Sequence, residues 1–316
     1  MVFFYNQKIG GGSYMKNGTH LLTLDNGYHL FTRTVGEGKI NLLCLHGGPG
    51  GTHEEFEHFD EHLKDLGVRV SMYDQLGSYF SDQPDFTDPK VRDKYLTFDY
   101  YIDEIEEVRQ KVGLDNFYLL GHSWGGLIAQ EYALKYGQHL KGLIIMSMID
   151  NIAEYTPHVN KLRRETLTPA QVSYMEGIES AEKFDDPEYQ SLVRILDNNF
   201  SMRNPEARKH RSGGHLATAV YNYFQGNNEF VMVGKLNGWD VRDRLHEIKV
   251  PTLLTFGDHD TMPLDAGRRM QQTLPNARFV LTPDSGHSHS RDNPAAFFQN
   301  LSTYLRDVEE DSFTAY

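Results

Sequence analysis

The sequence predicts an α/β protein in which a mostly parallel sheet is covered by helices on both faces. Short apolar runs typical of buried strands alternate with helical patterns up to about residue 150, and this alternation returns after residue 238. Residues 151–237 contain no clear strand run and are dominated by charges, prolines and helical patterns. We therefore expect residues 1–150 and 238–316 to form one core domain. The helical segment 151–237 is expected to form a cap over the carboxyl edge of the sheet.

The first half of the core is predicted to be a hairpin followed by strands and helices in turn. Residues 19–35 predict two strands around Asp25-Asn26-Gly27, because Asn-Gly tolerates the positive φ angles of a tight turn. Buried strands are predicted at 40–45, 68–73, 117–120 and 143–148. Helices are predicted at 101–112 and 127–136, and each is followed by a glycine, Gly113 or Gly137.

The second half of the core repeats this pattern after the cap. Strands are predicted at 250–256 and 278–281, and helices at 265–273 and 295–308. The chain has 316 residues, about twice a typical domain of roughly 150 residues. One large domain with an inserted cap accounts for that length.

Composition narrows the classes of function. The formal net charge is −13, from 44 Asp and Glu against 31 Lys and Arg, which makes nucleic-acid binding improbable because such affinity comes largely from cationic contacts to phosphate. No apolar run approaches the roughly 20 residues of a membrane-spanning helix, and the first residues lack the pattern of a signal peptide. The single cysteine, Cys44, excludes a disulfide framework and a cysteine-based zinc site. We expect a cytoplasmic protein in which Cys44 is a small buried side chain.

The strongest local signal is Gly121-His122-Ser123-Trp124-Gly125-Gly126. It matches G-x-S-x-G, follows a predicted strand and opens a predicted helix, which is the context that this nucleophile motif requires. The turn is so tight that its flanking positions need glycine, and the serine hydroxyl is held exposed above the sheet. We predict that Ser123 is a catalytic nucleophile.

A serine hydroxyl needs a general base, and the base needs an acid that orients it. On this architecture the acid and the histidine follow the serine in the sequence. Asp260 follows one predicted strand and His287 follows the next, so both lie at the carboxyl edge of the sheet, where Ser123 also lies. We predict His287 as base and Asp260 as acid.

Spacing alone leaves competitors for both roles. Asp258 lies two residues before Asp260, and Asp150 follows another predicted strand. His289 lies two residues after His287. Three other histidines, His20, His215 and His259, are interpreted as exposed or core residues without a catalytic role.

The glycine-rich run His46-Gly47-Gly48-Pro49-Gly50-Gly51 follows the strand predicted at 40–45. Glycines let the backbone approach a ligand closely. A loop at this place supplies one N–H to a developing oxyanion, and the residue after the nucleophile supplies the other. We assign these two amides to Gly48 and Trp124. The run lacks the lysine and the hydroxyl residue of a phosphate-binding loop.

Taken together, these motifs resemble the proline iminopeptidases. The resemblance is carried by HGGPGG at 46–51, YDQLGSYFSDQP at 73–84, GHSWGG at 121–126, GDHD at 257–260 and the SGHS at 285–288, and it runs from about Thr19 to Val308. The chain is most similar to the branch of that family that contains the archaeal tricorn-interacting aminopeptidase.

The resemblance implies an α/β-hydrolase fold with a helical cap, and a serine aminopeptidase that removes N-terminal residues, often proline, from peptides. It implies Ser123 as nucleophile, His287 as base and Asp260, rather than Asp258 or Asp150, as acid. It also implies Glu229, in the cap segment QGNNEF, as the group that binds the substrate amine. The archaeal relatives have a second glutamate directly after the acid, where this chain has Thr261.

The expected substrate is a small peptide or an aminoacyl amide, and no metal or organic cofactor is required. The oligomeric state is left open. Two other functions share these motifs: an amino-acid amidase, and an esterase or lactonase whose acyl group has no amine. A third alternative is a protein that uses the same pocket only to bind a ligand.

Overall fold

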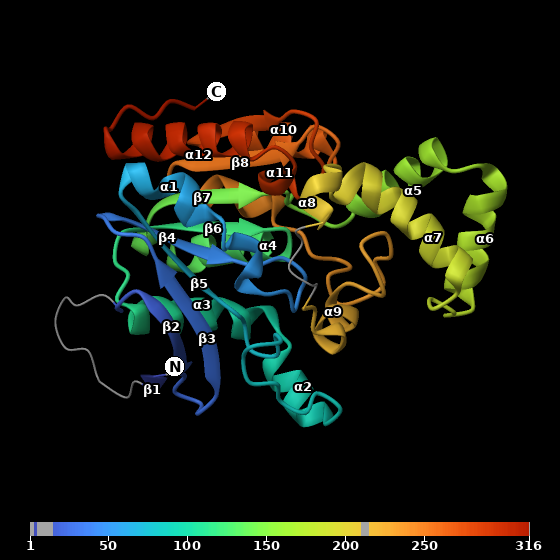
Figure 1. The fold of residues 1–316 in the computed structure, drawn as a ribbon, viewed down its shortest axis with the longest axis horizontal. Coiled ribbons are helices and arrows are strands. Elements are labelled where there is room, and N and C mark those ends of the chain that lie inside the picture. The colour runs from blue at the N-terminus through green and yellow to red at the C-terminus, as the bar shows by residue number, and fades with distance from the viewer. Residues whose placement is uncertain (1–2, 5–14, 210–214, 316) are drawn as a thin grey trace.

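The computed structural model describes residues 3–4, 15–209 and 215–315, and within them a nine-stranded sheet forms the centre of the molecule (Figure 1). The strand order is β1-β2-β3-β5-β4-β6-β7-β8-β9. The strands are β1 (Phe3–Phe4), β2 (Gly18–Thr23), β3 (His29–Val35), β4 (Ile40–Leu45), β5 (Val68–Tyr73), β6 (Phe117–His122), β7 (Leu140–Met146), β8 (Thr252–Gly257) and β9 (Ala277–Thr282).

The predicted hairpin and the predicted parallel sheet are both confirmed. β2 pairs with β3 in antiparallel register, and β3 pairs antiparallel with β5. Every pair from β5 through β4, β6, β7 and β8 to β9 is parallel. Along β5, β6 and β8 every residue is buried, as expected for parallel strands covered on both faces, whereas burial alternates along β3. The carboxyl ends of these parallel strands therefore all lie at one edge of the sheet.

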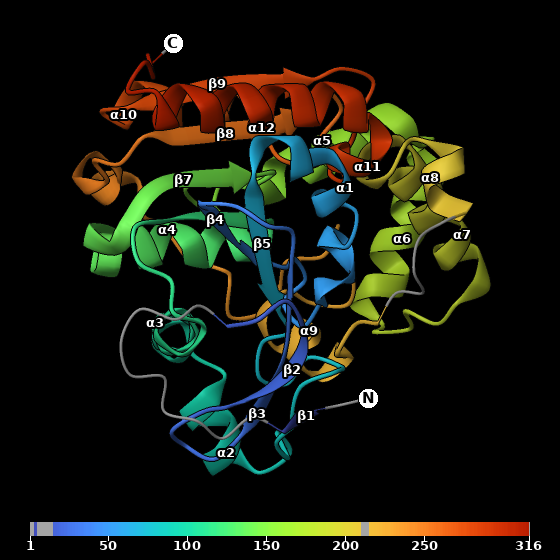
Figure 2. The ribbon, with the colours of Figure 1, turned by 60° about the vertical axis from the view of Figure 1, so that its left-hand side comes forward.

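Helices cover both faces of the sheet and create two apolar cores. On one face α3 (Phe98–Val112), α4 (Trp124–Tyr136) and α10 (Leu264–Thr273) pack on side chains such as Leu43, Leu119 and Ile145. On the other face α1 (Phe59–Leu63) and α12 (Pro294–Glu309) pack on strand residues that point the opposite way, such as Leu42 and Ile144. In Figure 2, α12 runs along β8 and β9. Cys44 is fully buried in the second core, as predicted.

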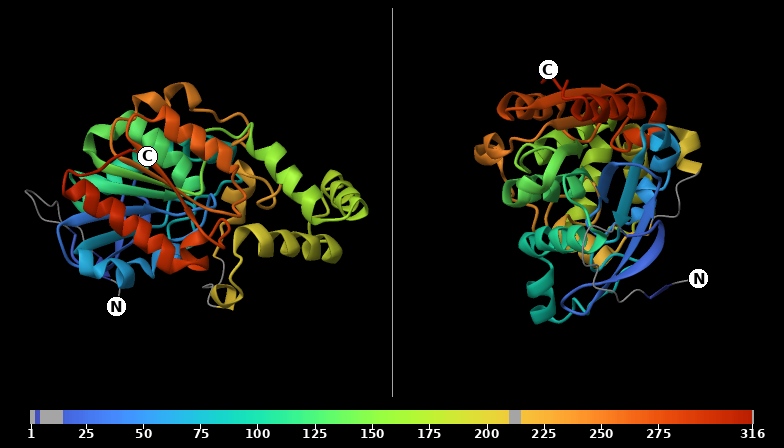
Figure 3. Two further views of the ribbon diagram at one scale, coloured as in Figure 1. Left: turned by 90° about the horizontal axis from the view of Figure 1, so that it is seen from above. Right: turned by 90° about the vertical axis from the view of Figure 1, so that its left-hand side faces the viewer.

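The chain between β7 and β8 is mainly helical. It contains α5 (Tyr155–Thr166), α6 (Pro169–Ser180), α7 (Pro187–Leu196), a π-helical turn (Asp197–Ser201), α8 (Pro205–Lys209) and α9 (Thr218–Phe224). The helices α5, α6 and α7 project beyond the edge of the sheet, as the left view of Figure 3 shows. An isolated bridge joins Asn151 to Asp240 at the base of this segment. The cap boundaries at residues 151 and 237 stay a prediction. In the sequence they lie at or near the two residues of this bridge.

Some element boundaries differ from the prediction for local reasons. The helix predicted from residue 101 begins at Phe98, because the Thr97 side chain accepts a hydrogen bond from the Tyr100 amide and caps it. The strand predicted at 143–148 spans Leu140–Met146, since Ser147 has a φ of 51° and turns the chain. α2 (Pro89–Tyr95) was not predicted. In the described part of the chain no helix is long and apolar enough to cross a membrane.

Candidate active site

Ser123 lies at the sharp turn between β6 and α4. Its φ of 51° and ψ of −120° fall in a region that non-glycine residues seldom adopt. A Cβ on Gly121 would lie 2.1 Å from the Gly125 carbonyl oxygen, and a Cβ on Gly125 would lie 2.2 Å from the Leu45 carbonyl oxygen. Glycine is therefore required on both sides of the turn. Ser123 lines a cavity of about 420 Å³ at the carboxyl edge of the sheet.

The structure brings Asp260 and His287 together from the loops that follow β8 and β9. The His287 Nδ1–H donates to Asp260 Oδ1 over 2.8 Å, and both side chains are buried. Asp260 also accepts the Ser147 hydroxyl at 2.6 Å and the Met262 amide at 3.1 Å. Burial alone would raise the pKa of Asp260, but the His287 ring and the Ser147 hydroxyl hold that pKa at about 2. The acid therefore remains ionised at neutral pH.

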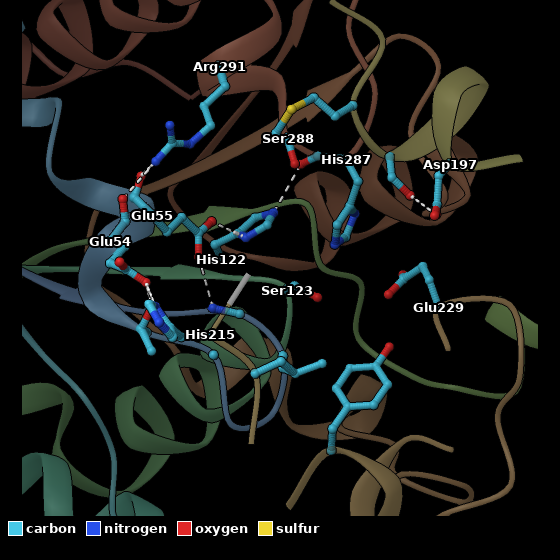
Figure 4. Close-up of a pocket in the computed structure, with 18 of the residues that line it drawn as sticks. Glu54, Glu55, His122, Ser123, Asp197, His215, Glu229, His287, Ser288 and Arg291 are labelled. Carbon is cyan, nitrogen blue, oxygen red and sulfur yellow. Dashed lines mark hydrogen bonds and ion pairs between the residues drawn. The ribbon is translucent and has the colours of Figure 1, made fainter. Parts of the chain in front are cut away.

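The imidazole of His287 presents its other nitrogen to the cavity. Within the described residues the buried Nε2 has no hydrogen-bond partner, and the ring points toward Ser123 in Figure 4. Burial alone would lower the pKa of His287, but the negative charges of Asp260 and Glu229 outweigh burial and raise it above its ordinary value. Because Nδ1–H is engaged by Asp260, the neutral ring offers Nε2 as a proton acceptor.

The competing acids are placed elsewhere. Asp258 bonds to His259 and to the Ser285 amide. Asp150 bonds to Asn151 and forms an ion pair with Arg269. Neither carboxylate is bonded to His287.

His289 also lies apart from the cavity. It is fully buried behind Asp260, between the hydroxyls of Ser147 and Thr255. Burial lowers the pKa of His289 to about 3, so its ring is neutral. It supports Ser147, which in turn donates to Asp260.

The glycine-rich loop after β4 is held by side chains around it. The His46 Nδ1–H donates to the Gly47 carbonyl at 2.8 Å, and its Nε2 accepts the Gln75 amide at 3.2 Å. The Gly47 amide is itself engaged by Glu55. Gly48 follows with a φ of 113° and lines the cavity beside Ser123.

Trp124 supplies the first amide of α4, one of the four N–H groups for which a helix offers no internal acceptor. Its indole is buried and donates to Gln75 at 2.8 Å, which fixes the residue after the nucleophile. The amides of Gly48 and Trp124 therefore both belong to elements that adjoin Ser123.

Glu229 lines the same cavity as Ser123 and the glycine-rich loop. Its carboxylate accepts the Tyr155 hydroxyl at 2.7 Å and the Thr261 hydroxyl at 3.3 Å. Figure 4 shows Ser123 and His287 between Glu229 on one side and Glu54, Glu55 and His122 on the other. The residue expected to bind an amine is thus on the wall opposite the Glu54–Glu55 pair.

A second, small pocket of about 10 Å³ adjoins Ser123 and Glu229. Its other lining residues include Gly48 and Trp124 and a set of mostly apolar side chains: Met148, Ile152, Tyr155, Met232, Leu236 and Met262. This pocket lies next to both the nucleophile and the carboxylate. With this volume it has room for about one water molecule.

Comparison with known proteins agrees with this geometry. A model of the alpha/beta hydrolase fold matches residues 40–294. A proline iminopeptidase of Flavobacterium johnsoniae is 34% identical over 281 residues, covering 86% of this chain and 92% of that protein. One of Elizabethkingia meningoseptica is 35% identical over 296 residues, covering 90% and 96%. The chain belongs to the proline iminopeptidase family of alpha/beta hydrolases.

The family extends to archaea, and its fold is seen in solved structures. A proline iminopeptidase of Saccharolobus solfataricus is 34% identical over 291 residues, covering 90% of this chain and 88% of that protein. The crystal structure of VinJ matches with a TM-score of 0.84 and 25% identity, covering 92% of this chain and 99% of that one. That of a Mycobacterium smegmatis proline iminopeptidase has a TM-score of 0.80 at 22% identity, covering 94% and 100%.

Sequence reasoning missed several residues around the site of this family member. His122, within the nucleophile motif, forms an ion pair with Glu55 and bonds to the His287 carbonyl through Nε2. Burial would raise the pKa of Glu55, but His122 and the Gly47 amide hold it at about 2. His215, interpreted as a histidine without a role, lines the cavity and bonds to Glu54. No spacing pattern links residues so far apart in the sequence.

No cluster of three or more potential metal ligands occurs among the residues that the structure describes. The polar residues that line the cavity include four serines, three histidines, four carboxylates and Arg291. Its chemistry is that of a nucleophile with charged partners.

Proposed function

We propose that this protein is a serine aminopeptidase that releases an N-terminal residue, preferably proline, from small peptides or aminoacyl amides. The observation that carries the proposal is the position of Glu229, a carboxylate on the same cavity as Ser123 and next to an apolar pocket. Names of the relatives point to the same activity. An exopeptidase must recognise a free ammonium group, and a partly buried carboxylate does so by a charge-assisted hydrogen bond.

In the proposed mechanism Ser123 Oγ attacks the carbonyl carbon of the N-terminal residue. His287 Nε2 takes the hydroxyl proton and returns it to the leaving amine, while Asp260 holds the imidazole and stabilises its charged form. The amides of Gly48 and Trp124 bind the oxyanion. A water molecule, activated by His287, then hydrolyses the acyl-enzyme and frees the N-terminal residue.

Glu229 and the apolar pocket position this substrate. Binding the ammonium at Glu229 places the carbonyl of the same N-terminal residue at Ser123, which is catalysis by orientation. The side chain of the N-terminal residue is directed toward Met148, Met232 and Met262, whose pocket of about 10 Å³ must widen to admit it. Thr261 stands where a second carboxylate was expected and bonds to Glu229 instead, so we assign the amine to Glu229 alone. The single buried cysteine suits a reducing compartment, and we propose the cytoplasm as the site of action.

Replacing Glu229 with glutamine tests the proposal directly. We expect kcat/KM for a prolyl arylamide to fall roughly 10- to 150-fold, since a hydrogen bond to a charged group contributes about 1.5–3 kcal/mol. Turnover of p-nitrophenyl acetate, which has no amine, should not fall. Steady-state kinetics on both substrates give the result.

Glu54→Gln is the matched control, because Glu54 lines the same cavity on the opposite wall. This variant should change kcat/KM for the prolyl arylamide and for p-nitrophenyl acetate by the same factor. Equal losses on both substrates in Glu229→Gln would favour an esterase or lactonase. A failure of a fluorophosphonate to label Ser123 would favour a protein that only binds its ligand.

A further inference from the structure

The loop that carries His287 is attached to the cap through its backbone. The His287 amide donates to the Phe200 carbonyl at 2.7 Å, and the Ser288 amide donates to the Ser201 carbonyl at 2.7 Å. Both acceptors belong to the π-helical turn Asp197–Ser201, a type of turn that is frequent at functional sites. The position of the histidine backbone thus depends on a segment of the cap.

The preceding amide of this loop reaches the cap through one carboxylate. The Gly286 amide donates to Asp292 Oδ2 at 2.8 Å, and the same oxygen accepts the Arg203 amide at 3.0 Å. Asp292 Oδ1 accepts the Asn204 amide at 2.8 Å. The Asp292 side chain is buried, and a Cβ on Gly286 would lie 2.3 Å from the Phe200 carbonyl oxygen. Three consecutive amides of the base loop are therefore held by the cap or by a carboxylate that binds the cap.

The catalytic groups themselves do not touch Asp292. The His287 ring is bonded to Asp260, and the His287 carbonyl accepts from His122 Nε2. Asp292 instead bonds the backbone on both sides of the junction between the cap and the base loop. A shift of the cap segment 200–204 would move the loop amides with it.

We propose that Asp292 is a positioning residue: it fastens the cap to the loop of His287, so that the placement of the cap sets the alignment of the base with Ser123 and Asp260. This inference rests on the role proposed for His287, but not on the amine specificity. Glu229 also belongs to the cap segment. A movement of the cap would therefore change both the binding of the substrate amine and the alignment of the base.

The test is Asp292→Asn, which keeps the shape but turns one acceptor oxygen into an NH₂ group facing backbone N–H donors. The matched control is Asp258→Asn, because Asp258 accepts the neighbouring Ser285 amide but has no bond to the cap. We expect kcat per titrated site to fall about tenfold or more on a prolyl arylamide and on p-nitrophenyl acetate alike, since a misplacement of about 1 Å can cost roughly 100-fold. Asp258→Asn should stay within about twofold.

The pH profile of kcat/KM separates positioning from a merely structural role. The charged or titratable groups that surround His287 are Asp260, Glu229, Glu55, His122 and His289. Looser pairing of His287 with Asp260 should move the apparent pKa of the base downward. Asp292→Asn also removes a negative charge near the loop, so the shift is compared with that in Gly286→Ala, which keeps Asp292. An unchanged profile and unchanged kcat per site, with only a lower Tm, would overturn the proposal.

Gly286→Ala provides a second variant that leaves Asp292 in place. Its methyl group would push the loop away from the Phe200 carbonyl, so it should reproduce the loss in kcat and the shift in pH profile. If it is active like the parent protein, the attachment to the cap does not align the base. Turnover of p-nitrophenyl acetate can be measured even if the protein hydrolyses no aminoacyl substrate. This test is therefore separate from the test of the aminopeptidase activity.

Discussion

Ser123→Ala is expected to reduce hydrolysis of a prolyl arylamide by about 10⁶-fold, the scale of loss on removing such a nucleophile from a serine protease. Alanine keeps the backbone of the turn but removes the only oxygen that attacks the carbonyl. The measurement is steady-state turnover at high enzyme concentration, with mass spectrometry after fluorophosphonate treatment to show that no label is incorporated.

Residual activity close to that of the parent protein would show that another group does the chemistry. Ser147→Ala is a useful comparison, because Ser147 also has a positive φ but donates to Asp260 rather than lining the cavity. It should retain fluorophosphonate labelling at Ser123. Loss of labelling only in Ser123→Ala identifies the nucleophile.

Asp260→Asn is expected to lower kcat by about 10⁴-fold, because an amide favours the wrong tautomer of the histidine and no longer stabilises its charged form. The effect is measured as kcat/KM over a pH series. The Asp260 charge raises the pKa of His287, so its removal should shift the pH profile of the remaining activity toward lower pH.

The competing acid, Asp258, supplies the result that would contradict the assignment of Asp260. If Asp258→Asn lost activity to the same extent while Asp260→Asn did not, the contact of 2.8 Å between His287 and Asp260 would not be the functional one. The structure predicts the reverse, because Asp258 bonds to His259 and to a backbone amide.

Local patterns predicted the core of the fold well where one physical signal dominates. β4 and β5 have the predicted bounds, because short, mostly apolar segments in a parallel sheet leave little choice of where the strand ends. α3 begins earlier than predicted, since its cap at Thr97 lies outside the periodic apolar positions. The cap is helical as expected, but the π-helical turn that meets the base loop has no signature in the sequence.

Some site residues could likewise be predicted from local sequence, and others could not. Ser123 could be predicted because the whole strand–turn–helix context is local. The choice between Asp260 and Asp258 could not be made from spacing, since both follow the same strand. The family resemblance favoured Asp260, and in the structure Asp260 is the one bonded to His287. The pairing of Glu55 with His122, and the attachment of Asp292 to Gly286 and to residues 203–204, depend on tertiary packing and were invisible to sequence reasoning.

The most direct measurement of the central claim compares prolyl arylamide with its N-acetylated form as substrates of the unaltered protein. Acetylation removes the positive charge that Glu229 is proposed to bind and leaves the scissile bond unchanged. We predict that the free-amine amide is hydrolysed and that acetylation abolishes turnover, with Ser123→Ala as the blank. Equal hydrolysis of both amides, or activity confined to p-nitrophenyl acetate, would contradict an aminopeptidase.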